Sequence, residues 1–219
     1  MSPVEAVVFD LDGVLVDSEH VWDEVREALA RERGGRWHDR AQADMMGMSS
    51  TEWSRYMRDV IGLSDSPDEI NREVVRRMQA SYAEDLPLID GAVEAVRRLA
   101  GFRLAVASSS NRPLIDAVLS ETGLGELFEV TVSSEEVPRG KPAPDVYLEA
   151  ARRLGVRPSG CAAVEDSANG IRAAYAAGMH VVAVPNRRYP PPPESLELTD
   201  AVLESVEDLS QDVVRGLSR

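Results

Sequence analysis

Short runs of apolar residues alternate along the chain with longer segments in which apolar residues recur every three or four positions. The runs cover residues 4–9, 102–107, 161–164 and 180–184, and valine and alanine dominate them. Unbroken apolar runs of this length are typical of strands that are buried on both faces. The pattern therefore predicts four buried strands.

Helical periodicity marks the segments between these runs. Residues 92–100 and 144–154 each place apolar side chains at helical spacing and stop at a glycine. A third such segment follows Ser167, a good N-cap residue, and ends at Gly178. Buried strands that alternate with helices predict an α/β fold, in which helices cover both faces of a doubly wound parallel sheet.

One long segment, 18–84, departs from this alternation. It contains amphipathic helical patterns such as VWDEVREALARER and STEWSRYMRDVIGL but no convincing strand. The alternating charges of these patterns are expected to form solvated faces. A helical insertion of this size indicates two domains, a core made of 1–17 and 85–219 and a small all-helical domain made of 18–84. The tail is expected to add an edge strand and a helix around 200–209.

The charge balance excludes two classes of partner. The 219 residues carry a formal net charge of −14, which argues against nucleic-acid binding and against docking on anionic membranes. A small anionic substrate is still compatible with this charge, because a metal ion and backbone dipoles can reverse the field locally. We therefore expect a monomer with a small-molecule partner, and neither a nucleic acid nor a membrane.

The only cysteine, Cys161, lies within an apolar run. A buried structural thiol and a reducing compartment fit this position. The first residues lack the basic and long apolar regions of a secretory leader, and no stretch approaches the roughly 18 uninterrupted apolar residues of a membrane span. The expected location is the cytoplasm.

Two carboxylates, Asp10 and Asp12, follow the first predicted strand. Side chains two positions apart on an extended chain point the same way, and the carboxyl ends of parallel strands line the ligand crevice. Gly13 lets the backbone turn away after the second acid. Adjacent carboxylates repel each other, and a hard divalent cation such as Mg²⁺ suits them. The alternative is a pair of aspartates that cap a turn.

Further polar residues follow the other predicted strands. Ser108 and Ser109 stand where hydroxyl and N–H groups can hold an anion at a helix start, although a simple N-cap also explains them. Lys141 lies in a proline-stiffened loop and is either functional or a solvated charge. Glu165 and Asp166 either ligate a metal or cap the next helix. All of these positions face one edge of the sheet, and together they form a set of groups suited to phosphoryl transfer.

The order of these motifs resembles that of the haloacid dehalogenase-like superfamily. DLDGVLVDS, which begins at Asp10, resembles the first motif of the superfamily, Ser108 the second, Lys141 the third and Glu165-Asp166 the fourth. The stretches KPAPD and EDSANG further resemble the branch that contains β-phosphoglucomutase and sugar-phosphate phosphatases. Members of that branch carry an α-helical cap between the first two motifs, where the helical insertion lies.

The resemblance implies a role for each acid. Asp10 would attack phosphorus and form an aspartyl-phosphate, while Asp12 would protonate the leaving oxygen and later activate water. Mg²⁺ would be held by Asp10, the backbone carbonyl of Asp12 and Asp166, with Glu165 assisting directly or through water.

The resemblance also implies a site for the transferred phosphoryl group. Ser108 and the N–H of Ser109 would bind its oxygens, and Lys141 would neutralise the developing charge. The implied activity is a Mg²⁺-dependent phosphatase that acts on a small phosphomonoester, for example a sugar phosphate. A β-phosphoglucomutase-like mutase is the main alternative. A dehalogenase fits less well, because the Asp12-Gly13 pair marks the phosphoryl-transfer branches of the superfamily. A non-catalytic phospho-receiver also fits less well, because it needs neither Asp12 as an acid and base nor a helical cap.

The predicted cap decides the substrate. Side chains that either line a pocket there or form the cap's own core are Trp22, Met46, Met48, Trp53, Tyr56 and Met57. Met46, before Gly47, and Ser50 stand where the mutases carry a lysine and an arginine for a second phosphate, and Trp22 stands in place of a cap histidine. These departures favour the phosphatase, although Arg55 or Arg58 offers a replacement cation.

Overall fold

A parallel sheet forms the centre of the protein. The structure is a computed structural model that describes residues 3–46 and 48–217, so Gly47 lies outside the described residues. Within them, six strands pair in the order β3-β2-β1-β4-β5-β6, and every pairing is parallel. The strands are β1 Ala6–Phe9, β2 Arg103–Ser108, β3 Val130–Ser133, β4 Cys161–Glu165, β5 His180–Ala183 and β6 Ala201–Val202.

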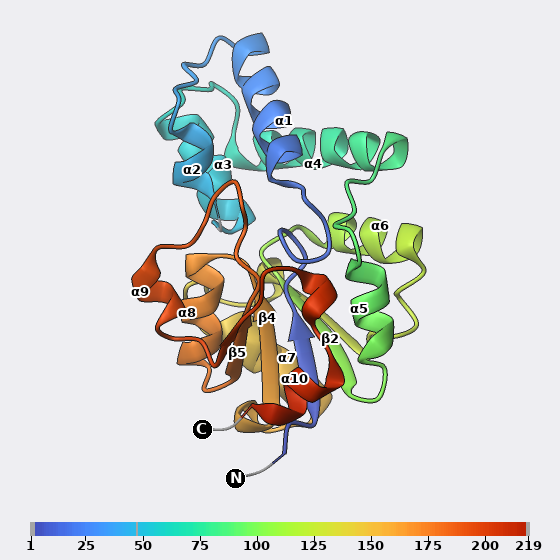
Figure 1. The fold of residues 1–219 in the computed structure, drawn as a ribbon. Helices are drawn as coiled ribbons and strands as arrows, with labels where there is room; N and C mark the ends of the chain where they lie inside the picture. The colour runs from blue at the N-terminus through green and yellow to red at the C-terminus, as the bar shows by residue number, and fades with distance from the viewer. Residues whose placement is uncertain (1–2, 47, 218–219) are drawn as a thin grey trace.

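Helices cover both faces of this sheet (Figure 1). They are α5 Ala92–Arg98, α6 Arg112–Thr122, α7 Asp145–Leu154, α8 Ala168–Ala176, α9 Pro193–Leu196 and α10 Gln211–Gly216. Val7 and Phe9 of β1 belong to the same apolar cluster as α5, α6 and α10, whereas Ala6 and Val8 pack with α7 and α8. This alternation confirms the doubly wound α/β fold, because successive side chains of a strand point to opposite faces.

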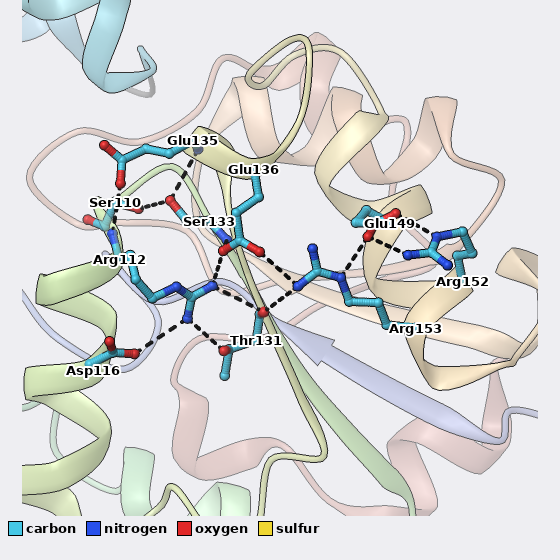
Figure 2. A network of polar contacts seen from close by, with 10 residues as sticks. All are labelled: Ser110, Arg112, Asp116, Thr131, Ser133, Glu135, Glu136, Glu149, Arg152 and Arg153. Atoms are coloured by element: carbon cyan, nitrogen blue, oxygen red, sulfur yellow. Dashed lines mark hydrogen bonds and ion pairs between the residues drawn. The ribbon is translucent and has the colours of Figure 1, made fainter.

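The strand β3 was not predicted. It has only four residues, and Val130 and Thr131 are half-buried, so no apolar run marks it. Figure 2 shows how two arginines cover this sheet edge. The Thr131 carbonyl accepts hydrogen bonds from Arg112 Nη2 at 3.1 Å and Arg153 Nη1 at 3.2 Å, and both guanidinium groups pair with Glu136. Charged groups at a sheet edge hinder pairing with another chain.

Four helices lie between β1 and α5 and form a separate layer above the sheet (Figure 1). They are α1 Glu19–Glu32, α2 Ala41–Met45, α3 Ser50–Asp59 and α4 Pro67–Glu84, and their described residues contain no strand. We call these four helices the cap. The two chain segments that lead to it lie side by side, because Val16 bridges Leu88 and the Asp17 N–H donates to the Pro87 carbonyl at 2.8 Å.

The C-terminal part agrees only in part with the prediction. The edge strand is present as β6, but the region around 200–209 contains a single 3₁₀ turn, Val206–Asp208, and the helix α10 starts only at Gln211. Cys161 is buried, as predicted. Nowhere in the described part of the chain is a helix both long and apolar enough to cross a bilayer.

Candidate active site

The predicted acids and hydroxyls lie together at the carboxyl ends of three neighbouring strands. Asp10 follows β1, which lies between β2 and β4 with Phe9 in register with Val106 and Val164. Ser108 ends β2 and Glu165 ends β4. The chain runs outward from β1 through β2 to β3 and then returns to β4 on the other side. Ligands of such sheets bind at this switch point, beyond the carboxyl ends of the strands.

Asp10, Glu165 and Asp166 form a buried acidic cluster. Their carboxylate oxygens lie within 4.8 Å of one another. Burial and the neighbouring Glu165 carboxylate raise the pKa values of Asp10 and Asp166 well above the usual range. Ionisation of these acids is therefore unfavourable without a cation. A hard divalent cation would neutralise their negative charge, and carboxylate oxygens are suitable ligands for it.

Gly13 makes the approach of Asp166 possible. Its φ is +80°, and a Cβ atom there would lie 1.9 Å from Asp166 Oδ2. A larger residue would be strained and would displace the Asp166 carboxylate. The glycine predicted to turn the chain after Asp12 therefore also gives the acidic cluster its space.

Lys141 is buried within this cluster. Its Nζ lies 2.6 Å from Glu165 Oε1 and 3.0 Å from Asp10 Oδ1, and its side chain is 2% exposed. Burial alone would lower the pKa of Lys141, but the Asp10 and Glu165 carboxylates outweigh burial and raise it. The ammonium group is therefore a fixed positive charge beside Asp10.

Glu165 contacts Lys141, and other donors also bind both of its carboxylate oxygens. Oε1 also accepts a hydrogen bond from Tyr147 Oη at 2.6 Å, and Oε2 accepts one from the Asp166 N–H at 3.1 Å. The absence of a side chain at Gly170 makes room for the carboxylate, because a Cβ there would lie 1.8 Å from Oε1. Tyr147 was missed as a site residue, since an aromatic residue at helical spacing reads as core.

The Asp12 carboxylate lies where the core meets the cap. Oδ2 accepts from Ser110 Oγ at 2.6 Å and from Ser108 Oγ at 3.4 Å. Oδ1 accepts from Ser18 Oγ at 2.5 Å and from Trp22 Nε1 at 3.3 Å. These donors fix the carboxylate on the cap side of the cluster.

Ser110 was missed by sequence reasoning, because a run of three serines does not reveal which hydroxyl faces the site. Ser108 Oγ accepts a hydrogen bond from the Ser110 N–H at 2.9 Å, and Ser133 Oγ donates to the Ser110 carbonyl at 2.7 Å. Ser133 ends the edge strand β3 (Figure 2). The unpredicted strand thus supports the loop that holds Asp12.

A small pocket, with a cavity volume of about 50 Å³ and partly open to solvent, joins the acidic cluster to the cap. Five of the predicted site residues line it, and Ser108 and Glu165 lie behind them. The lining residues are Asp10, Asp12, Glu19, Trp22, Arg26, Met45, Met46, Met48, Trp53, Ser109, Ser110, Lys141, Asp166 and Ser167. Tyr56 and Met57 do not line it, since Tyr56 Oη donates to Asp44 Oδ2 at 2.9 Å and Met57 is buried in the cap.

Two charged residues of α1 in this lining were not predicted, because the charges of an amphipathic helix were expected on its solvated face. Arg26 is buried, and Gln42 connects it to Glu19: Arg26 Nη1 donates to Gln42 Oε1 at 3.3 Å, and Gln42 Nε2 donates to Glu19 Oε2 at 2.7 Å. Burial and the nearby Asp12 carboxylate raise the pKa of Glu19 to about 7. The solvated-face prediction is therefore wrong for Arg26.

The raised pKa of Glu19 has a consequence for stability. A carboxyl group with a higher pKa in the folded than in the unfolded protein destabilises the fold as the pH rises, here between about 4.5 and about 7. We expect Glu19→Gln to raise the free energy of unfolding at pH 8 by roughly 2–3 kcal/mol, and to change it little at pH 4. Urea unfolding at both pH values, with EDTA present, measures this difference.

Glu24→Gln is the matched control, because Glu24 is an exposed acid of the same helix. Its effect should be small at both pH values. An equal effect of Glu19→Gln at pH 4 and pH 8 would contradict the assignment.

The profile of the haloacid dehalogenase-like hydrolases matches residues 4–178. The chain belongs to this family. The predicted resemblance is confirmed, and so is the predicted enzyme class, a phosphoric monoester hydrolase, since several relatives of this chain are named as phosphatases.

Curated relatives match most of the chain. Hexitol phosphatase B of Escherichia coli is 32% identical over 231 residues, which cover 96% of each protein. Fructose-1-phosphate phosphatase YqaB of Escherichia coli is 34% identical and covers 81% of this chain and 95% of its own. The chain spans about half the length of a third relative, the bifunctional riboflavin kinase/FMN phosphatase of Arabidopsis thaliana, which is 34% identical over 82% of this chain.

Among solved structures, CbbY from Rhodobacter sphaeroides in complex with phosphate superimposes with a TM-score of 0.85. It is 28% identical, and the match covers 98% of this chain and all of that one. β-Phosphoglucomutase from Clostridium difficile reaches a TM-score of 0.83 at 23% identity, with 96% and 95% of the two chains covered. This second likeness concerns the fold.

Proposed function

We propose that the protein is a Mg²⁺-dependent phosphatase that releases inorganic phosphate from a small phosphomonoester through an aspartyl-phosphate on Asp10. The observation that carries this proposal is the contact of Asp10 Oδ1 with Lys141 Nζ at 3.0 Å, within the acidic cluster. Asp10 faces the pocket as a potential nucleophile, and the positive charge of Lys141 beside it would offset the negative charge of a phosphoryl group.

The metal would be held by carboxylate oxygens of Asp10 and Asp166 and by the backbone carbonyl of Asp12. Once bound, Mg²⁺ neutralises phosphoryl charge and so allows a carboxylate to approach phosphorus. Hydrogen bonds already occupy both oxygens of Glu165. We therefore assign Glu165 mainly to positioning Lys141, with any contact to the metal shared with these bonds.

Asp10 and Asp12 have different roles in the formation and the hydrolysis of the aspartyl-phosphate. Asp10 attacks phosphorus while Asp12 protonates the departing oxygen, and Asp12 then takes a proton from the water that attacks the aspartyl-phosphate. Ser109 and Lys141, which line the pocket, bind the phosphoryl oxygens with Ser108 behind them. The hydrogen bonds from Ser18 and Ser110 hold the Asp12 carboxylate where the core meets the cap, within reach of the leaving oxygen in this proposal.

The substrate is proposed to be a phosphorylated sugar or a similar small metabolite. Two relatives are named for hexitol and fructose-1-phosphate phosphatase activities, and the pocket of this chain is lined by both the acidic cluster and the cap. We propose that residues 18–84 act as a cap domain and that residues 1–17 and 85–219 form the core domain. The two connecting segments, paired at Val16 and Leu88, are the proposed hinge between these domains.

A phosphomutase needs a second phosphate site in the cap, and the cap cations considered for it lie elsewhere. Arg55 and Arg58 are exposed and do not line the pocket, and Arg58 Nε pairs with Asp59 at 2.6 Å. Met46, which does line it, is uncharged. The cap cation that does line the pocket is Arg26. Water is our proposed final acceptor of the phosphoryl group, because two relatives that match most of the chain are named as phosphatases.

The acceptor can be tested directly. With Mg²⁺, β-glucose 1-phosphate and a catalytic amount of glucose 1,6-bisphosphate, we expect free phosphate to form faster than glucose 6-phosphate. A coupled assay for each product in the same sample measures the ratio. Faster formation of glucose 6-phosphate would favour the mutase, and no turnover of any phosphomonoester would favour a phospho-receiver.

A further inference from the structure

Arg26 is a buried cation without a carboxylate partner. Arg26 is 4% exposed, and its Nη1 donates a hydrogen bond to the neutral amide of Gln42. Arg26 Nε is buried and has no hydrogen-bond partner among the described residues. Leaving a buried donor unsatisfied costs free energy, and leaving a buried charge unpaired costs more.

Other arginines of the cap have the carboxylate partner that Arg26 lacks. Arg77 pairs with Glu32 at 2.5 Å and with Glu73 at 2.7 Å, and the exposed Arg31 pairs with Glu27 at 2.7 Å. Arg26, the most deeply buried of these three, forms no ion pair with a described residue.

Two tryptophans hold the Arg26 guanidinium in place. Its central carbon lies 4.4 Å from the centroid of the Trp22 ring and 4.8 Å from that of Trp53, and the two rings meet edge to face at 5.9 Å. Stacking on indole rings fixes the plane of the guanidinium and stabilises its charge, but it satisfies none of its N–H donors.

The same group faces the reaction site. Arg26 lines the pocket that Asp10 and Lys141 also line. Trp22 links Arg26 to the reaction site. The Arg26 guanidinium stacks on the Trp22 ring, and Trp22 Nε1 donates to Asp12 Oδ1 at 3.3 Å. One indole ring therefore contacts both the proposed acid of the reaction and Arg26.

We propose that Arg26 binds an anionic group, a carboxylate or a second phosphate, at the end of the substrate opposite the transferred phosphoryl group. The guanidinium offers only donors, and planar or tetrahedral anionic oxygens are its best partners. Glu19 does not form an ion pair with Arg26, and its Oε2 instead accepts a hydrogen bond from Gln42 Nε2 at 2.7 Å. This inference rests on the proposed phosphatase activity and narrows its substrate class.

Matched substrate pairs test the proposal. 3-Phosphoglycerate and glycerol 3-phosphate differ by a carboxylate in place of a hydroxymethyl group, and fructose 1,6-bisphosphate and fructose 1-phosphate differ by a second phosphate. We expect the wild-type protein to show a higher kcat/KM for the anionic member of at least one pair. The pair that shows this preference identifies the anion.

Arg26→Met should reduce that preference by about tenfold to a hundredfold, the loss expected for a charge-assisted hydrogen bond. Arg31→Met, which changes an exposed arginine on the same helix, should keep the preference. Far-UV circular dichroism and urea unfolding check the fold. If Arg26→Met does not fold, Arg26→Gln replaces it, because glutamine also packs a planar polar group between the indole rings.

Two results would overturn the proposal: a wild-type protein that hydrolyses glycerol 3-phosphate and fructose 1-phosphate as well as the members that carry an additional anionic group, or a preference that survives in the folded Arg26 variant. Both leave the phosphatase activity itself intact. The failure of the proposed function is different, since the wild-type protein would then release phosphate from no member of either pair.

Discussion

Asp10→Asn is expected to abolish turnover while the protein stays folded and at least as stable as the wild type in the absence of metal. The amide is neither a nucleophile nor a good Mg²⁺ ligand, so kcat should fall by at least about a thousandfold. Burial and Glu165 raise the pKa of Asp10, which means that its ionisation destabilises the metal-free fold. Asparagine removes this charge without changing the size of the side chain.

Phosphate release and urea unfolding in EDTA measure the two parts of this prediction. Asp17→Asn is a suitable control, because Asp17 is an exposed acid near the end of the same motif and does not line the catalytic pocket. Substantial Mg²⁺-dependent turnover by a folded Asp10→Asn protein would contradict the mechanism.

Lys141→Met is expected to affect both catalysis and stability. Lys141 is the only lysine in the chain, and it is the cation that contacts Asp10 and the fully buried Glu165. Removing one partner of a buried ion pair costs about 3–5 kcal/mol, because the remaining charge is left unpaired. We expect a loss of that size in urea unfolding with EDTA, and activity too low to measure.

The double variant Lys141→Met with Glu165→Gln separates the two effects. Neutralising Glu165 should recover much of the lost stability, because the unpaired charge is then gone, but it should not restore activity. Lys141→Arg should stay inactive, since a guanidinium fork does not fit the place of a compact ammonium group. Unchanged stability of Lys141→Met in EDTA would show that the buried pairing is assigned wrongly.

The sequence predicted those parts of the fold that depend on periodicity. The strands β1, β2, β4 and β5 are buried on both faces and therefore form apolar runs, and three of the four cap helices, α1, α3 and α4, show amphipathic spacing. The short helix α2 was not predicted, because five residues are too few to show a helical period. The strand β3 escaped because it is short and half-buried at the sheet edge. It is held by its parallel pairing with β2 and by hydrogen bonds from Arg112 and Arg153 to the Thr131 carbonyl.

The candidate site was predictable where a residue follows a strand. Asp10, Ser108 and Glu165 occupy such positions, and the order of the motifs supplied the rest. Tyr147 and Arg26 were not predictable, because each lies on a helix whose pattern is explained by packing or by solvation. Only their three-dimensional neighbours, the Glu165 carboxylate and the Trp22 ring, reveal what they do.

Trapping the phosphorylated protein tests the central claim most directly. Asp12→Ala should still bind Mg²⁺, because the proposed ligand at that position is a backbone carbonyl, and it should still react with ³²P-acetyl phosphate, whose acetate leaves without a proton donor. The bond from acetate oxygen to phosphorus breaks and a bond from Asp10 to phosphorus forms, but no base remains to activate water. The account predicts nearly one acid-stable, hydroxylamine-sensitive label per chain, on the peptide that contains Asp10, and none when Asp10→Asn is added. A label on another residue, or no label while the wild-type protein hydrolyses acetyl phosphate, would contradict it.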